Sequence, residues 1–453
     1  MSNGVKIAVV GAGSAQFSLA LMRDLVLTRS LAGSELTLMD VDQDRLELVG
    51  GLARRYAEEA DTRLSVRTTL SRTDALRNAD FVINTALAGG HRVYEAERAL
   101  AERHGYYRGL SRLHMQRNLI LMLEVVEEMG DVCPDAWLIQ ASNPVFEGCT
   151  LMTRETTQKI VGLCHGYRGY LKVARVLGLD PERISWQAPG FNHCIYLTDF
   201  NYEGQSIYPL LDEWIENKAE EYWANTELRY GETDLSRAAI DHYRRVGLLP
   251  LGDTTRAFDD GAGPSTWWYH NDMEAKQRWF GSLGGFDSGP GWAQYLEHLE
   301  DGMRDIRRAV EDPSRPVSEL LPLVPSGEHH IELIESLVTG QERILQVNLP
   351  NRGAISGIAN DVVVEGKGVV TGGRVQMLQV GSFPDQLYWR IFAPRQVRLE
   401  QTLLAFREHD LGLLREILLE DHRTTATAQV DALLEEALQA PGNSSVASWY
   451  RFK

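Results

Sequence analysis

The chain has 453 residues, of which 43% are hydrophobic and 24% are charged, and its formal net charge is -17 at pH 7. This composition is typical of a folded globular protein and excludes a largely disordered one, and the length suits about two or three domains. The negative charge disfavours nucleic acid and anionic membranes as partners, because the field of the protein repels phosphates at long range. No apolar run approaches the length of a membrane span.

Short apolar runs alternate with amphipathic helical stretches over the first 165 residues. Helix-length segments such as 19–28 and 44–59 separate the runs. This alternation predicts an α/β fold, a Rossmann-like doubly wound parallel sheet with helices on both faces. The predicted strands are Lys6–Val10, Glu35–Asp40, Leu64–Thr68, Phe81–Ala86, Trp137–Ser142 and Lys159–Cys164.

The pattern changes after about residue 195 to longer helices with aromatic clusters. Residues 355–380 are rich in Val and Gly and predict antiparallel strands, and residues 386–439 predict helices. We therefore expect a Rossmann-like domain over residues 1–195 and a mixed α+β domain over 196–453.

The cysteines and the start of the chain indicate in which cellular compartment the protein is expected. The first predicted strand begins at Lys6, which leaves no room for a signal peptide. The four cysteines are scattered, as expected for reduced thiols rather than a disulfide framework. We expect a cytoplasmic protein. The cysteines are Cys133, Cys149, Cys164 and Cys194.

A glycine-rich turn, VVGAGSAQFS, follows the first predicted strand and precedes a helix. Gly11 permits the tight turn, and Gly13 lets the backbone approach a pyrophosphate at the positive end of the helix, next to Ser14. Gln16 replaces the third glycine of the usual fingerprint, so the turn alone is also consistent with a loop without a ligand. Asp40, which ends the second strand, can accept hydrogen bonds from a ribose hydroxyl and favours NAD over NADP.

Polar residues follow two further strands of the predicted sheet. Asn84 begins the stretch NTALAGG and Asn143 belongs to ASNP, and the carboxyl ends of parallel strands face the ligand crevice. We therefore predict that both asparagines contact the cofactor, and that Asn143 also contacts the substrate. A simple turn residue before Pro144 is an equally good interpretation of Asn143.

Cysteine and histidine occur at the ends of two neighbouring predicted strands. Cys164 ends the sixth strand, and GFNH, which contains His193, opens a strand predicted over residues 193–200. A lone cysteine at such a place is more often a small buried apolar residue. Together, the two side chains could hold a divalent metal and leave coordination positions open for substrate oxygens.

Further motifs extend over nearly the whole chain, and the set resembles the NAD- and metal-dependent glycosidases of glycoside hydrolase family 4. The set is specific, because malate and lactate dehydrogenases share only its early members. The run Cys164-His165-Gly166 and the DHYR motif resemble the α-glucosidase branch most closely. The motifs are GAGSAQFSL, LMDVD, NTALAGGH, SNPVFEG, GLCHGYRG, GFNH, AAIDHYR, PLGDTTR, WWYH, SGEHH and DVVVE.

The resemblance implies hydrolysis of an α-glycoside, with an α-glucoside as the first candidate, by a redox route. In that family NAD accepts a hydride from C3 of the sugar, so that the C2 proton becomes acidic. A divalent metal, with Mn²⁺ as our expectation, stabilises the enediolate. The leaving group departs from C1, water adds and the hydride returns. This route is an exception to the mechanism with two carboxylates.

The resemblance also implies roles for single residues. Cys164 and His193 bind the metal together with sugar oxygens. Asp241 removes the C2 proton, with Tyr243 as an alternative, although Asp241 without its motif would be interpreted as a solvated helix carboxylate. His165 protonates the leaving group. The predicted substrate contacts are Asn143, Asn192 and Arg256, and His270 and His329 are interpreted as structural.

One stretch departs from the α-glucosidase pattern. The segment LSRLHMQRNL lacks an acidic residue that this branch can place over the sugar. It brings instead a cluster of Arg108, Arg112, His114 and Arg117, which we hypothesise binds an anionic sugar through charge-assisted hydrogen bonds. A solvated helix face is at least as good an interpretation.

Several functions therefore stay open. The same mechanism could act on α-glucuronides or other α-hexosides. A plain NAD-dependent 2-hydroxy acid or polyol dehydrogenase would accumulate NADH and would not need Cys164, and a nucleotide-binding regulator would bind NAD without a metal. By analogy with the family we expect a homodimer or homotetramer whose partner is a small glycoside.

Overall fold

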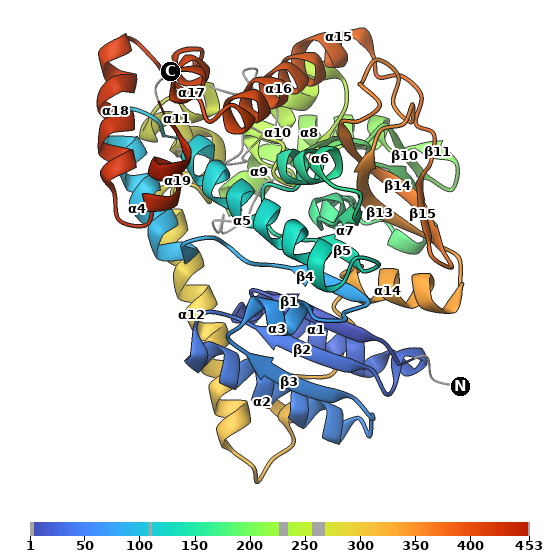
Figure 1. Ribbon diagram of the computed structural model, residues 1–453. Helices are drawn as coiled ribbons and strands as arrows, with labels where there is room; N and C mark the ends of the chain where they lie inside the picture. Colours follow the sequence, from blue (N-terminus) through green and yellow to red (C-terminus); the bar gives the residue numbers. More distant parts are fainter. Residues whose placement is uncertain (1–3, 108–110, 226–233, 256–267, 452–453) are drawn as a thin grey trace.

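The computed structural model describes residues 4–107, 111–225, 234–255 and 268–451. The N-terminal strands and helices, coloured blue, lie at one end of the molecule, and the C-terminal helices, coloured red, lie at the other (Figure 1). The chain between residues 280 and 330 runs back along the N-terminal part, so segments distant in sequence lie together (Figure 1).

Six parallel strands form one half of the main sheet, as the sequence predicts. They are β1 (Lys6–Val10), β2 (Glu35–Met39), β3 (Ser65–Thr69), β4 (Phe81–Asn84), β5 (Trp137–Gln140) and β6 (Lys159–Gly162). Their order is β3-β2-β1-β4-β5-β6, with β1 paired to both β2 and β4. The direction of winding therefore reverses between β1 and β4, where ligands bind in open α/β sheets.

Helices cover the parallel strands because these strands are apolar on both faces. Residues 7–10 of β1 and all four residues of β4 are buried, as expected for strands covered on both sides. The helices are α1 (Ala15–Leu27), α2 (Gln43–Glu59), α3 (Arg72–Leu76), α4 (Gly90–Arg103), α5 (Ser111–Val132), α6 (Val145–Glu155) and α7 (Gly169–Leu177). Two of the helices begin at side-chain caps: at α2, Asp42 accepts a hydrogen bond from the amide of Arg45 at 3.0 Å, and at α3, Ser71 accepts one from the amide of Asp74 at 3.2 Å.

Antiparallel strands extend the same sheet beyond β6. They are β8 (Gly190–Phe191), β9 (Cys194–Tyr196), β12 (Pro250–Leu251), β13 (Arg343–Pro350), β14 (Val363–Thr371) and β15 (Arg374–Met377). β13 joins β6 where Asn348 lies opposite Gly162, and the order continues β13-β14-β8-β9-β12, with β15 beside β14. The predicted antiparallel strands within residues 355–380 are confirmed. The predicted boundary near residue 195 falls within this sheet and stays a prediction.

The strand predicted over residues 193–200 is wrong as a single element. Its first part is β9 in the main sheet, whereas Asp199–Tyr202 forms β10 in a second sheet. That sheet has the order β11-β10-β7, with β7 at Ile184–Gln187 and β11 at Gln205–Ser206. Leu197 and Thr198 make the transition, because their amides donate to carbonyls of two different segments, Leu249 and Gln187.

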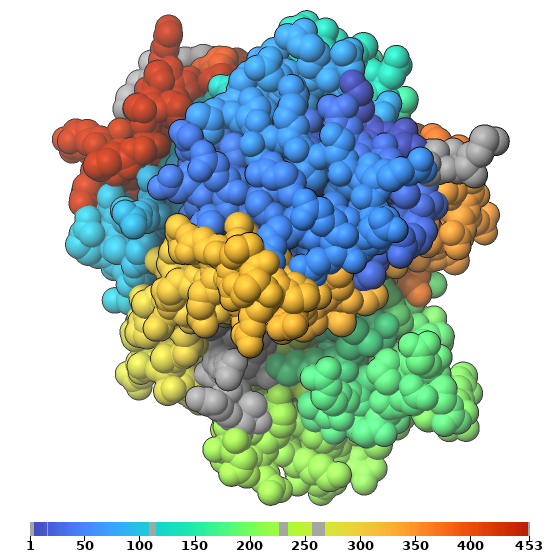
Figure 2. Space-filling view, turned by 90° about the horizontal axis from the view of Figure 1, so that it is seen from below, coloured from blue at the N-terminus to red at the C-terminus, as the bar shows by residue number. Residues whose placement is uncertain are grey.

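Helices form most of the remaining chain, and none of the described helices is long and apolar enough to cross a membrane. The segment that contains α12 lies between the N-terminal part and the green part of the chain in Figure 2. The helices are α8 (Tyr208–Asn217), α9 (Ala219–Asn225), α10 (Arg237–Val246), α11 (Met273–Phe280), α12 (Gly289–Glu311), α13 (Val317–Leu320), α14 (His330–Thr339), α15 (Asp385–Leu387), α16 (Ala393–Arg407), α17 (Leu411–Leu419), α18 (Thr427–Gln439) and α19 (Ser444–Trp449), with a π-helical turn at Tyr388–Phe392.

Replacement of Leu38 tests the packing of the parallel sheet. Leu38 on β2 is fully buried, so Leu38→Ala leaves a cavity and we expect it to lower the free energy of unfolding by about 2–5 kcal/mol in urea titrations. Val41, which is 87% exposed, provides the control, because Val41→Ala removes no packing. Equal stability of the two variants would contradict the assigned core.

Candidate functional site

The glycine turn after β1 closes against two neighbouring strands. The amides of Gly11 and Ala12 both donate to the carbonyl of Met39 at 2.9 Å. Gly11 has φ +88°, and a Cβ there would lie 2.5 Å from the backbone of Ala86. Only glycine suits both the left-handed backbone and this close approach. The turn is therefore fixed at the point where the winding of the sheet reverses.

Asp40 lies directly beneath this turn. Its Oδ2 accepts a hydrogen bond from the amide of Gly13 at 2.7 Å, and its Oδ1 accepts one from the amide of Asp42 at 2.9 Å. A Cβ on Gly13 would lie 2.9 Å from the carboxylate, so the position requires glycine. Ser14 is half-buried at the N-cap of α1. The structure therefore brings together four of the six predicted cofactor residues, Gly11, Gly13, Ser14 and Asp40.

The two asparagines at the strand ends differ from each other. Asn84 is fully buried, and its Nδ2 donates to Oε1 of Gln140 at 3.0 Å. Its side chain therefore faces β5 rather than the open end of the strand, and a cofactor contact of Asn84 stays a prediction. Asn143 is exposed after β5, at the end of the sheet where the prediction places it.

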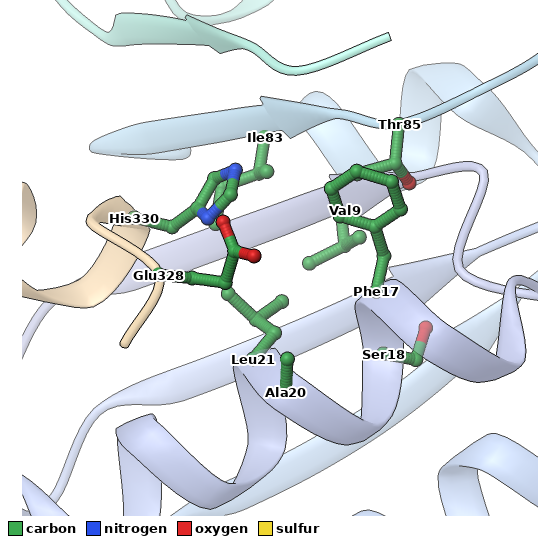
Figure 3. A pocket seen from close by; sticks show the side chains of 9 residues that line it. All are labelled: Val9, Phe17, Ser18, Ala20, Leu21, Ile83, Thr85, Glu328 and His330. Atoms are coloured by element: carbon green, nitrogen blue, oxygen red, sulfur yellow. The ribbon is translucent and has the colours of Figure 1, made fainter. Parts of the chain in front are cut away.

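A pocket opens between α1 and the sheet, with about 280 Å³ of empty space that is partly open to solvent. Phe17 and His330 lie on opposite sides of it, with Glu328 beside His330 (Figure 3). Burial lowers the pKa of His330 to about 4. Thr85, which follows β4, also lines the pocket. The pocket therefore lies between the end of β4 and the segment that carries Glu328.

The loop after β6 packs against a second loop, and this contact carries Cys164 toward Asp253. A Cβ at Gly252, whose φ is +56°, would lie 2.9 Å from Cα of Gly166. A Cβ at Gly166 would in turn lie 3.8 Å from Sγ of Cys164. Glycine at position 252 therefore lets the backbones meet, with Cys164 two residues before Gly166 and Asp253 one residue after Gly252.

His193 lies beside Asp253. Its Nε2 is 3.7 Å from Oδ2 of Asp253, and its side chain is 9% exposed. The preceding Asn192 is fully buried, and its Nδ2 donates to Glu365 at 3.0 Å. Within the described part of the chain, Oδ1 of Asn192 has no hydrogen-bond partner. A buried acceptor of this kind fits a substrate hydroxyl, as predicted for Asn192.

Glu365 lies behind this pair on β14. It is buried, and burial raises the pKa of its carboxyl to about 7 despite hydrogen bonds from Asn192 and Gln346. Glu365 belongs to the motif DVVVE. It therefore supports Asn192 from the side of the antiparallel strands.

His165 is exposed near the same loop contact. Its Nδ1 is 3.5 Å from Oε1 of Glu328, and its side chain is 56% exposed. Glu328 also lines the pocket beside α1. The predicted proton donor therefore lies on the loop of Cys164, next to a residue that lines the pocket. His329, interpreted as structural, is stacked on Tyr167 and bonded to its hydroxyl.

The residues that we predicted as the base lie on α10 and are engaged elsewhere. The carboxylate of Asp241 accepts hydrogen bonds from Arg245 at 2.7 Å and from the hydroxyl of Tyr269 at 2.6 Å. The hydroxyl of Tyr243 donates to Asp212 at 2.7 Å, and burial raises its pKa. In the described part of the chain Asp253 is the carboxylate beside His193, and a catalytic role of Asp241 or Tyr243 stays a prediction.

The hypothesis that Arg117 binds an anionic sugar, as part of the cationic cluster, is wrong. Its side chain is 4% exposed and paired with Glu97 at 2.8 Å. Its Nε donates to the carbonyl of Ala88 at 2.8 Å, so it holds the loop after β4 rather than a free anion site. Arg108 and Arg256 lie outside the described residues, as do the side chains of Arg112 and His114.

The donor set fits a metal whose coordination is completed by substrate. Among the described residues, no group of three or more His, Cys, Asp or Glu side chains is arranged to hold a metal ion. A thiolate and an imidazole suit a divalent transition metal and leave positions open for oxygens. The unfilled acceptor of Asn192 next to His193 fits a sugar at those positions.

Two residues of this site escaped the sequence analysis although their motifs were found. PLGDTTR drew attention to Arg256, and the carboxylate of Asp253 three residues earlier was not selected. SGEHH likewise contains Glu328. The available signal for Asp253 was the glycine before it in the sequence. The reason for that glycine, the close approach of Gly252 to Gly166, is visible only in the fold.

Comparison with known proteins decides the family. Residues 6–179 match the model of the family 4 glycosyl hydrolases, and residues 188–424 match the model of the family 4 glycosyl hydrolase C-terminal domain. The chain belongs to glycosyl hydrolase family 4. The family therefore matches the resemblance drawn from the motifs, and the chain is a glycosidase.

Relatives of this family 4 enzyme act on different sugars. The α-galacturonidase of Thermoanaerobacterium saccharolyticum is 24% identical over 443 residues, which cover 90% of this chain and 89% of the relative. The α-glucosidase of Erwinia rhapontici is 27% identical over 396 residues, covering 83% and 84%. A structure of a 6-phospho-α-glucosidase from gut microorganisms in complex with NAD and Mn²⁺ superposes with a TM-score of 0.75, at 15% identity and full coverage of both chains.

His242, between the two residues first predicted as bases, makes the stability depend on pH. Its Nε2 is 2.9 Å from the hydroxyl of Tyr196, and burial lowers its pKa from 6.5 to about 4. The unfolded chain therefore binds a proton below pH 6.5 that the folded chain does not, so stability is lost as the pH falls. Between pH 7.5 and 5 we expect the wild type to lose about 2 kcal/mol more than His242→Gln in urea unfolding.

The exposed His298 supplies the control for this measurement. His298→Gln should follow the wild type over the same pH range. A wild type whose stability changes with pH in parallel with His242→Gln would show that His242 does not titrate as its burial implies.

Proposed function

We propose that this family 4 glycosidase cleaves α-linked hexosides by transient NAD-dependent oxidation of the sugar at C3. The observation that carries the proposal is that Gly166, two residues after Cys164, packs against Gly252, and that the next residue, Asp253, lies 3.7 Å from His193. The loop of Cys164 follows the carboxyl end of β6, and the glycine turn follows the carboxyl end of β1 in the same sheet. A cofactor and a sugar could therefore meet there.

The cofactors of the proposal are NAD and a divalent metal such as Mn²⁺, both of which the related 6-phospho-α-glucosidase structure contains. Gly11, Gly13 and Asp40 would hold the adenosine and pyrophosphate end of NAD. Cys164 and His193 would hold the metal, which when bound acts as a Lewis acid toward the sugar oxygens at C2 and C3.

Side chains of this enzyme would then move the protons. Asp253, 3.7 Å from His193, is placed to remove the proton at C2, and we prefer it to Asp241, whose carboxylate is bonded to Arg245 and Tyr269. His165 with Glu328 would protonate the leaving oxygen, since an imidazole can donate a proton near neutral pH. Asn192 would accept a hydrogen bond from a sugar hydroxyl.

Two sugars are proposed as substrates. The α-glucosides come first, because the Cys164-His165 run resembles the α-glucosidase branch. The α-galacturonides come second, because the α-galacturonidase relative aligns over more of this chain than the α-glucosidase does. The cytoplasmic location and the homodimeric or homotetrameric assembly stay predictions.

Release of nitrophenol from α-glucoside, α-galactoside, α-glucuronide and α-galacturonide tests the proposal. We expect release from one of these sugars to require both NAD and Mn²⁺, without accumulation of NADH, because the hydride returns to the sugar in each turnover. Accumulation of NADH with free hydroxy acids or polyols, and no cleavage of any glycoside, would favour the dehydrogenase alternative instead.

Paired substitutions separate the two candidate bases. Asp253→Asn should lower kcat by about 100-fold or more, as loss of a general base does, while the Kd of NAD from fluorescence titration stays unchanged. Asp241→Asn is the matched control, with the same change of chemistry on α10, and should lower kcat less than about tenfold. The reverse order of the two effects would return the base to Asp241.

A further inference from the structure

We propose that a buried network of Lys276, Asp287 and His270 positions the loop that carries Asp253. This inference rests on the proposed function of that loop. All three side chains are completely buried, with Nζ of Lys276 3.1 Å from Oδ1 of Asp287 and Nδ1 of His270 3.3 Å from Oδ2. One carboxylate therefore lies between a lysine and a histidine from different segments.

His270 extends the network to the loop of Asp253. Its Nε2 is 2.9 Å from the carbonyl of Thr255, which can only accept a hydrogen bond. On the other side of the ring, Nδ1 faces the carboxylate of Asp287, which also accepts. A proton on each nitrogen serves both acceptors, whereas a bare Nδ1 would place a lone pair against the carboxylate. Asp287 thus fixes the orientation in which His270 donates to Thr255.

Lys276 extends the network to another segment. Its Nζ donates to the carbonyl of Tyr107 at 2.5 Å, four residues after the end of α4. Burial alone would raise the pKa of Asp287, but Lys276 and His270 hold it well below its ordinary value. The network is therefore a fixed brace between the chain after α4 and the loop at Thr255.

The loop of Asp253 is also held by the residues on either side of Asp253. The amide of Gly252 donates to Oδ1 of Asp234 at 2.8 Å, and Oγ1 of Thr254 accepts from the amide of Ile195 at 3.1 Å. His270 supplies a further anchor at Thr255. Three supports on consecutive parts of one short loop fix the backbone from which Asp253 extends.

The chemistry of the brace points to positioning rather than to stability. Burying charged side chains costs desolvation energy, and well-packed apolar residues often replace a buried ion pair without loss of stability. A lysine ammonium 3.1 Å and a histidine ring nitrogen 3.3 Å from one carboxylate, however, fix relative positions that apolar packing does not. Misplacement of a catalytic group by about 1 Å can cost on the order of 100-fold in rate, so the brace bears on kcat.

His270→Phe and His270→Gln test the proposal as a pair. Phe keeps the bulk of the ring but loses the donor to Thr255, whereas Gln keeps an amide donor. We expect His270→Phe to lower kcat at least tenfold with the Kd of NAD unchanged, and His270→Gln to recover most of the loss. Amide hydrogen exchange in a peptide covering Gly252–Thr255 should rise at least tenfold in His270→Phe alone.

Glu147→Gln is the matched control, because Glu147 forms another buried pair, with Arg395 at 3.3 Å. It should change thermal stability and leave kcat and the exchange of the loop unchanged. Wild-type kcat and loop exchange in folded His270→Phe would overturn the proposal, and if that variant does not fold, Asp287→Asn decides by the same two measurements. The hydrogen-exchange measurement does not depend on catalytic activity, so it tests the brace even if the enzyme is inactive. A wild type without glycosidase activity would contradict the proposed function and not the brace.

Discussion

The close contact between Gly166 and Gly252 is the constraint on which the site depends. A side chain on Gly252 would lie 2.9 Å from Cα of Gly166, so two loops from distant parts of the sequence meet this closely because position 252 lacks a side chain. One loop begins with Cys164 at the end of a parallel strand, and the other carries Asp253, which reaches His193. The chemistry that we propose for Cys164, His193 and Asp253 therefore depends on a backbone packing contact.

The mixed sheet explains how His193 comes to this place. A purely parallel Rossmann sheet would end at β6, but here β13 pairs with β6 and the antiparallel strands continue to β8 and β9. His193 lies between β8 and β9 with φ +59°, in a tight turn that directs the chain back along the sheet. The same arrangement places Glu365 of β14 behind Asn192. The second half of the chain thus builds one wall of a site whose other wall belongs to the nucleotide-binding half.

Local patterns sufficed for the parallel strands, the glycine turn and Asp40, because alternating apolar runs and a strand-turn-helix motif are short-range signals. Motifs at strand ends also drew attention to Cys164 and His193, whose role as metal ligands stays a prediction. The sequence did not show that Arg117 pairs with Glu97 or that Asp241 pairs with Arg245 and Tyr269, because charged residues on a helix look alike whether solvent or another side chain faces them. Asp253 was missed for the converse reason: its partners His193 and Gly166 are 60 and 87 residues away in the chain, and only the fold brings them near.

Hydrolysis in deuterium oxide tests the central claim most directly, because the claim is that the proton at C2 leaves the sugar during each turnover. The enzyme, NAD and Mn²⁺ would be incubated with a cleaved α-glycoside in deuterium oxide, and the released sugar analysed by NMR. The account predicts deuterium at C2 of the product. A product that keeps its original hydrogen at C2 would contradict it, since direct displacement at C1 leaves that bond intact.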